Sequence, residues 1–135
     1  MVKARILVIE DNEDNLELFR FLLEQDGYEV TGSQDGRDGL EKVQQLHPDL
    51  VLLDMGLPEI DGWQVVKKIK SNPACRNIVV VALTAHALPG DRKKAIDAGC
   101  DGYISKPLDV PNFTNMIATY LRKRKTLAQT GNLTL

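Results

Sequence analysis

The chain has 135 residues, of which 43% are hydrophobic and 27% are charged, and its formal net charge is -2. This composition is typical of one globular domain, and such a charge gives no reason to expect nucleic-acid binding. No apolar stretch approaches the roughly 20 residues that span a bilayer, so no membrane association is expected. Cys75 and Cys100 form no Cys-x-x-Cys pair, which predicts reduced thiols and a cytoplasmic location.

Apolar runs alternate with segments of helical periodicity along the chain. The run 50–53 has four consecutive aliphatic residues, which is typical of a strand buried on both faces of a sheet. Asn12 favours a helix start, and Gly27 favours a helix end. In chain order, the sequence predicts strands over 5–9, 28–31, 49–54, 78–83 and 102–105. The first predicted helix follows Asn12, and the second ends at His47. The third covers 62–71, the fourth covers 91–98, and the fifth runs from 109 or 110 to 123.

Strands that alternate with helices form a parallel sheet with helices on both faces, because the crossover connections are right-handed. Five such units predict an α/β fold: a flavodoxin-like (βα)5 three-layer sandwich with strand order 2-1-3-4-5. We expect this domain to cover residues 1–123 and to be followed by a polar, flexible tail over 124–135, which carries no packing pattern. In this fold, ligands bind at the carboxyl ends of the strands, and the switch point lies between the first and third strands.

Polar side chains stand at the carboxyl ends of four predicted strands: Glu10-Asp11, Asp54, Thr84 and Lys106. Each has an ordinary structural explanation, such as a charge pair that favours a helix start. Together they converge on the edge that the fold assigns to ligands. Two like charges 4 Å apart repel by about 4 kcal/mol at an effective dielectric near 20. A cluster of carboxylates without His or Cys therefore predicts a hard cation, and Mg²⁺ fits best.

The same residues predict phosphoryl chemistry. Asp54 is the natural nucleophile, because carboxylates can accept phosphoryl groups covalently. A metal ion, the Lys106 ammonium and the Thr84 hydroxyl could together stabilise the charge of a phosphoryl group in transfer.

At this point the chain resembles a response-regulator receiver domain of two-component signalling, of the stand-alone single-domain type. The resemblance covers about residues 4–123. It rests on Glu10-Asp11, on Asp54 with the D-x-x-x-P-x-x-D-G segment through Gly62, on Thr84-Ala85 and on Lys106-Pro107.

The resemblance implies a role for each matching residue. Asp54 would be the phosphoacceptor, and Thr84 and Lys106 would contact the phosphoryl group. Asp11, Asp54 and the backbone carbonyl of Gly56 would bind Mg²⁺, and Glu10 would act through water. Tyr103 would be the switch aromatic, Ala85 and His86 would lie at the rim, and the Lys106-Pro107 bond would be cis.

The chain departs mildly from the family pattern. Glu10 stands where Asp is commoner, which bears on the affinity for Mg²⁺. Gly56 and His86 occupy two positions that, in this family, influence how long the phosphorylation lasts.

The resulting hypothesis is a phosphorylation-controlled signalling switch and not an enzyme, apart from self-phosphorylation and autodephosphorylation. A histidine kinase or phosphotransfer protein would be the donor, and protein–protein contacts in trans would carry the signal. The partner would bind the face formed by the fourth helix, fifth strand and fifth helix. Two alternatives stay open: a constitutive pseudo-receiver scaffold, and a small phosphohydrolase with an aspartyl intermediate. Such a hydrolase usually needs an acid/base Asp two residues after the nucleophile, where this chain has Gly56.

Overall fold

The computed structural model describes residues 4–57, 59–85, 90–106 and 108–133. Strands and helices alternate through these residues as the sequence predicts. The elements are β1 (Arg5–Ile9), α1 (Glu13–Gln25), β2 (Glu29–Ser33), α2 (Gly36–Leu46), β3 (Leu50–Asp54), α3 (Gly62–Ser71), β4 (Val79–Thr84), α4 (Asp91–Asp97), β5 (Gly102–Ser105) and α5 (Val110–Leu133).

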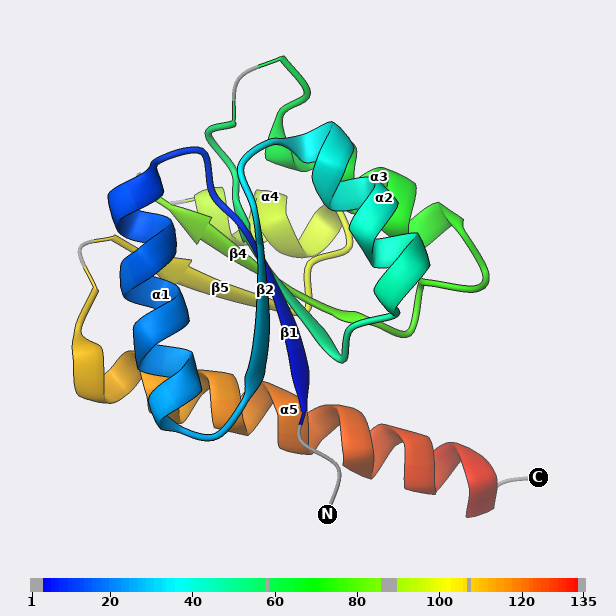
Figure 1. Cartoon of the computed structure of the whole chain (residues 1–135). Helices are drawn as coiled ribbons and strands as arrows, with labels where there is room; N and C mark the ends of the chain where they lie inside the picture. Colours follow the sequence, from blue (N-terminus) through cyan, green and yellow to red (C-terminus); the bar gives the residue numbers. More distant parts are fainter. Residues whose placement is uncertain (1–3, 58, 86–89, 107, 134–135) are drawn as a thin grey trace.

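The sheet is parallel, and its strand order is β2-β1-β3-β4-β5, which confirms the predicted topology. Figure 1 shows α1 and α5 on one face of the sheet and α2, α3 and α4 on the other. The fold is therefore the predicted three-layer sandwich. Because the strands are parallel, the carboxyl ends of β1, β3, β4 and β5 lie along one edge.

Two hydrophobic clusters hold the layers together, one on each face of the sheet. They use alternate residues of the same strand, because successive side chains of a strand point to opposite faces. Leu50 and Leu52 of β3 belong to the cluster with Phe19 of α1 and Phe113 of α5. Val51 of β3 belongs to the cluster on the side of α2, α3 and α4. The four consecutive buried aliphatic residues of β3, 50–53, thus contribute to the hydrophobic clusters on both faces of the sheet.

Side-chain caps fix the starts of three helices next to the functional edge. The side-chain oxygens of Asn12, Asp35 and Asp61 accept the backbone N–H of the residue three positions later at the starts of α1, α2 and α3. The predicted cap at Asn12 is confirmed. Gly27 and Gly99 adopt φ angles of 90° and 109° just after α1 and α4, a conformation that favours glycine at helix ends.

Some boundaries differ from those predicted. The second strand covers Glu29–Ser33 instead of 28–31, and α5 continues to Leu133 instead of ending at 123. The sequence was expected to form a tail from 124 because it shows no packing stripe. However, residues 123–130 contain no Gly or Pro and are rich in good helix formers, which favours continuation of the helical backbone. The domain boundary at 123 itself stays a prediction.

Both cysteines are buried free thiols, in agreement with the predicted absence of a disulfide. Burial raises the pKa of Cys100 to about 12, so this thiol stays protonated at neutral pH. In the part of the chain that the structure describes, no helix combines the length and the apolar character needed to cross a membrane.

His47 offers a test of backbone strain. It ends α2 with φ 46° and ψ 62°, a left-handed conformation that is unfavourable for residues with a Cβ atom. Its side chain is exposed, so little packing is lost when it is removed. We expect His47→Gly to raise the free energy of unfolding by roughly 0.5–1 kcal/mol, measured by urea unfolding. Glu41→Gly, an exposed position inside α2, is the control and should lower it by about 1 kcal/mol. Equal destabilisation by both changes would contradict the strain.

Candidate functional site

The candidate site lies at the carboxyl edge of the sheet, where the ends of four strands meet. Glu10 directly follows β1, Asp54 is the last residue of β3, Thr84 is the last of β4, and Lys106 directly follows β5. The strand register places Asp54 beside Leu83 and Thr84 beside Ser105. The structure thus brings together, along one edge, residues that are up to 96 positions apart in the sequence.

Three carboxylates form a tight cluster at this edge. One oxygen each of Glu10, Asp11 and Asp54 lies within 4.8 Å of the others. Glu10 is fully buried, Asp54 is 8% exposed, and Asp11 faces solvent. The cluster is therefore open to solvent on the side of Asp11 and closed on the side of Glu10.

Lys106 places a positive charge between the two buried carboxylates. Its Nζ lies 3.3 Å from Oε1 of Glu10 and 3.6 Å from Oδ2 of Asp54. The other oxygen of Asp54, Oδ1, accepts the backbone N–H of Gly56 at 2.9 Å. Both oxygens of Asp54 thus face a positive or partly positive group, which orients the carboxylate.

The two buried carboxyl groups have pKa values that move in opposite directions. Burial raises the pKa of Glu10 to about 7, and the neighbouring Asp54 carboxylate adds to the rise, while Lys106 opposes it. Burial would also raise the pKa of Asp54, but hydrogen bonds from Glu10 and from the Gly56 N–H, together with Lys106, lower it overall. A proton at this site therefore resides on Glu10, and Asp54 stays ionised as a nucleophile must be.

The donor set fits a hard divalent cation. Oε2 of Glu10 is buried and has no hydrogen-bond partner among the described residues, and such an atom is costly unless a cation or water contacts it. The three clustered side chains offer only carboxylate oxygens, which suit Mg²⁺ and not zinc. The residues present therefore match the ion that the sequence predicts. The role of the Gly56 carbonyl oxygen stays a prediction.

A cleft of about 220 Å³ opens beside Asp54. Among the described residues, its lining includes Thr84 and Ala85 from the end of β4 and Tyr103 from β5. Trp63 and Lys94 complete the side formed by α3 and α4. From the sequence, Thr84, Ala85 and Tyr103 are expected at this edge. His86 and Pro107 lie outside the described residues, so the predicted cis bond between Lys106 and Pro107 is not described either.

Gly62 explains how Trp63 comes so near the cleft. A Cβ atom at position 62 would lie 2.5 Å from the Cα of Met55, so only glycine lets α3 start this close to the end of β3. The backbone N–H of Gly62 also donates to the Met55 carbonyl at 3.4 Å. Trp63, the next residue, is thereby held against the cleft.

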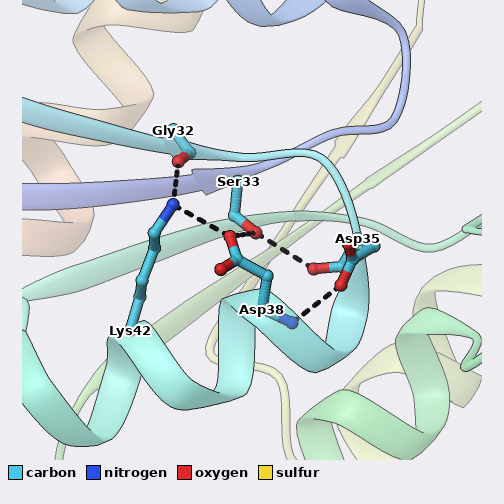
Figure 2. A network of polar contacts seen from close by, with 5 residues as sticks. All are labelled: Gly32, Ser33, Asp35, Asp38 and Lys42. Carbon is cyan, nitrogen blue, oxygen red and sulfur yellow. Dashed lines mark hydrogen bonds and ion pairs between the residues drawn. The ribbon is translucent and has the colours of Figure 1, made fainter.

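A network of polar contacts fixes the neighbouring corner between β2 and α2 (Figure 2). The Ser33 hydroxyl donates to Oδ2 of Asp38 at 2.7 Å, and Nζ of Lys42 contacts the same oxygen at 2.8 Å and the Gly32 carbonyl at 2.9 Å. The carbonyl of Ser33, in turn, accepts the backbone N–H of Glu10 at 2.9 Å. The corner therefore holds the backbone at the start of the acidic pair.

Two residues near the site were missed from the sequence. The Asn15 side chain hydrogen-bonds Glu10 and lowers its pKa; a polar residue in the first turn after the acidic pair was the only signal for it. Nζ of Lys94 lies 4.6 Å from the centroid of the Trp63 ring. No local pattern could reveal that contact, because it depends on how α3 and α4 pack.

Comparisons with known proteins agree with this geometry. The family model of the response regulator receiver domain matches residues 6–118. The polar-differentiation response regulator DivK of Brucella ovis is 43% identical over 116 residues, which cover 86% of this chain and 94% of that protein. The DivK protein of Brucella anthropi is 42% identical over the same shares of the two chains.

Solved structures have the same fold. A CheY-like response regulator receiver domain protein from Methanospirillum hungatei JF-1 has a TM-score of 0.85 at 26% identity, over 93% of this chain and 98% of that one. The receiver domain of the sensor histidine kinase PA1611 from Pseudomonas aeruginosa PAO1, with a magnesium ion coordinated in its active site cleft, has a TM-score of 0.81 at 30% identity, over 89% and 98%. From the matched family model, the curated relatives and the fold, we conclude that this chain belongs to the response regulator receiver domain family of two-component signalling.

Proposed function

We propose that this chain is a phosphorylation-controlled signalling switch that accepts a phosphoryl group on Asp54. The observation that carries the proposal is the environment of that carboxylate. Its pKa is lowered despite burial, it lies at the floor of a cleft, and it is held between the Lys106 ammonium and the Gly56 N–H. Any buried carboxylate needs such partners, but this one also lines a cleft that is open to a phosphodonor.

The residues of the chain have distinct roles in the transfer. A carboxylate oxygen of Asp54 attacks the phosphorus while the donor's bond to phosphorus breaks and its electron pair leaves with the donor. Lys106 offsets the charge that the phosphoryl group brings into the site. The Thr84 hydroxyl, at the end of the adjacent strand, donates to a phosphoryl oxygen. Asp11, Asp54 and the Gly56 carbonyl would hold Mg²⁺, with Glu10 acting through water, and the ion would supply positive charge that offsets the phosphoryl oxygens. The magnesium ion described for the PA1611 receiver domain supports this choice of ion.

The donor in this proposal is a histidine kinase or a phosphotransfer protein, as the resemblance to response regulators implies. The chain catalyses no reaction beyond its own phosphorylation and dephosphorylation. Its cytoplasmic location stays a prediction from the sequence. The output is contact with a downstream protein, and neither nucleic acid nor a membrane takes part.

Thr84 and Tyr103 provide the link from the phosphoryl group to the surface. Both line the cleft beside Asp54, and Tyr103 is half-buried against the hydrophobic cluster on the side of α3 and α4. If Thr84 moves toward the phosphoryl group, Tyr103 can turn into the space beside it. The phosphoryl group thereby biases a two-state element that exists before phosphorylation. The face that changes consists of α4, β5 and α5, and we propose that the partner binds there.

The acceptor is tested by Asp54→Asn. In the presence of Mg²⁺, acetyl phosphate should add one phosphoryl group to the wild-type chain and none to the variant, measured by intact-protein mass. Because Asn is nearly isosteric with Asp, the circular dichroism spectrum should be unchanged. Full phosphorylation of the variant would refute the assignment.

The metal site is tested by magnesium titration of Trp63 fluorescence. Trp63 is the only tryptophan and lines the cleft, so binding of Mg²⁺ should change its emission. Asp11→Ala should weaken binding strongly because Asp11 is a direct ligand, whereas Glu10→Ala should weaken it less because Glu10 acts through water. Equal affinity of the wild type and Asp11→Ala for Mg²⁺ would contradict the proposed ligand set.

The switch is tested by Tyr103→Ala. This change should leave phosphorylation of Asp54 intact and reduce phosphorylation-dependent binding of the downstream protein, because the residue that transmits the signal is removed. In the wild type, backbone NMR shifts on addition of beryllofluoride should extend from Thr84 into α4, β5 and α5. Shifts confined to the loops of Asp11, Asp54 and Lys106 would show that the coupling is wrong.

A further inference from the structure

The cleft beside Asp54 has a second cation on its lining, Lys94, which the roles above do not use. Its Nζ lies 4.6 Å from the centroid of the Trp63 ring, within the range of a cation–π contact. Lys94 is exposed and Trp63 is half-buried, so the ring holds a charge that faces solvent. Among the described side chains, no carboxylate forms an ion pair with Lys94. The ammonium therefore keeps donors for an anion that enters the cleft.

The geometry of phosphoryl transfer decides which part of a donor would meet Lys94. In an in-line displacement, the attacking and leaving groups lie on opposite sides of the phosphorus. Asp54, the attacking group, is buried at the floor of the cleft, so the leaving group points toward the mouth. Lys106 is bound to Glu10 and Asp54 at the floor, whereas Lys94 lies on the exposed rim. The rim cation therefore faces the leaving group.

We propose that Lys94, held in place by Trp63, is a specificity-determining residue that favours phosphodonors with a carboxylate leaving group, that is, acyl phosphates. This inference rests on the proposed function of Asp54. As the bond from Asp54 to phosphorus forms, the bond from phosphorus to the acyl oxygen breaks, and its electron pair leaves with the carboxylate. The negative charge on that carboxylate grows during the step, and the nearby ammonium stabilises it.

A donor whose leaving nitrogen is cationic is not attracted by Lys94 in this way. Phosphoramidate carries a protonated nitrogen, and when the bond from phosphorus to nitrogen breaks, the electron pair stays on nitrogen and ammonia leaves. The leaving nitrogen changes from positive to neutral, so the Lys94 ammonium repels it in the bound donor and never attracts it. The ratio of the two phosphorylation rates, acetyl phosphate over phosphoramidate, therefore isolates the contribution of Lys94 from effects on Asp54, on Mg²⁺ or on folding.

The experiment measures the second-order rate constants for both donors by intact-protein mass, at donor concentrations below saturation, with saturating Mg²⁺ and at fixed pH. Lys94→Met removes the charge and keeps an unbranched apolar stem over Trp63, and Lys94→Arg restores a cation. Lys67→Met is the matched control, because Lys67 is an exposed lysine of the adjacent helix α3 and is absent from the described lining of the cleft.

We expect Lys94→Met to lower the second-order rate constant for acetyl phosphate about fivefold, the effect of one unit charge at 4 Å in water, and not to lower that for phosphoramidate. Lys94→Arg and Lys67→Met should keep the rate ratio of the wild type. Added salt should lower the ratio in the wild type toward that of Lys94→Met, because screening weakens an exposed charge. An unchanged ratio in Lys94→Met, or an equal loss with both donors, would overturn the inference while leaving Asp54 as the acceptor. Failure of both donors to modify the wild type would instead overturn the proposed function, and this inference with it.

Discussion

The structure depends on an electrostatic constraint at one edge of the sheet, where three carboxylates lie within 4.8 Å of one another and two of them are buried. Two like charges at 4 Å repel by about 4 kcal/mol at an effective dielectric near 20, so the cluster lowers stability unless positive charge or a proton offsets it. Lys106 supplies part of that offset by contacting both Glu10 and Asp54. The pKa of Glu10 is nevertheless raised, first by burial and then by the neighbouring Asp54 carboxylate, so the negative charge is not fully offset. The same imbalance makes the site receptive to a divalent cation.

The rest of the fold provides a rigid frame that tolerates this unfavourable edge. Alternate residues of the central strands pack into two hydrophobic clusters, so most of the stabilising burial lies away from the site. Close packing between helices and strands then fixes the positions of the elements that carry the site. A Cβ atom on Gly39 would lie 2.5 Å from Cδ1 of Ile9, so glycine lets α2 pack closely on β1. Through the contacts of Ser33 with Asp38 and with the Glu10 backbone, that corner fixes where the acidic pair starts.

One cleft serves the acceptor, the switch and the choice of donor in the function proposed here. Thr84 and Tyr103 lie on its lining together with Trp63 and Lys94, so a phosphoryl group on Asp54 is close to both the signalling pair and the rim cation. A charge added at the floor of the cleft changes the electrostatic energy of every charged or polar group around it. In this view, recognition of the donor and transmission of the signal share one small volume, and the substitutions proposed above separate them.

The sequence by itself determined the order of elements, the parallel sheet and the polar strand ends. These features follow from apolar runs, caps such as Asn12 and the residues that directly follow each strand, all of which are short-range properties. The convergence of Glu10, Asp54 and Lys106 could also be predicted, because strand topology places strand ends side by side. Only the tertiary structure decided that Glu10 is fully buried and that Lys94 lies over Trp63. Distances between side chains on different helices depend on how closely those helices approach. That approach is set by contacts such as Gly62 against Met55, which link separate elements and leave no local pattern in the sequence.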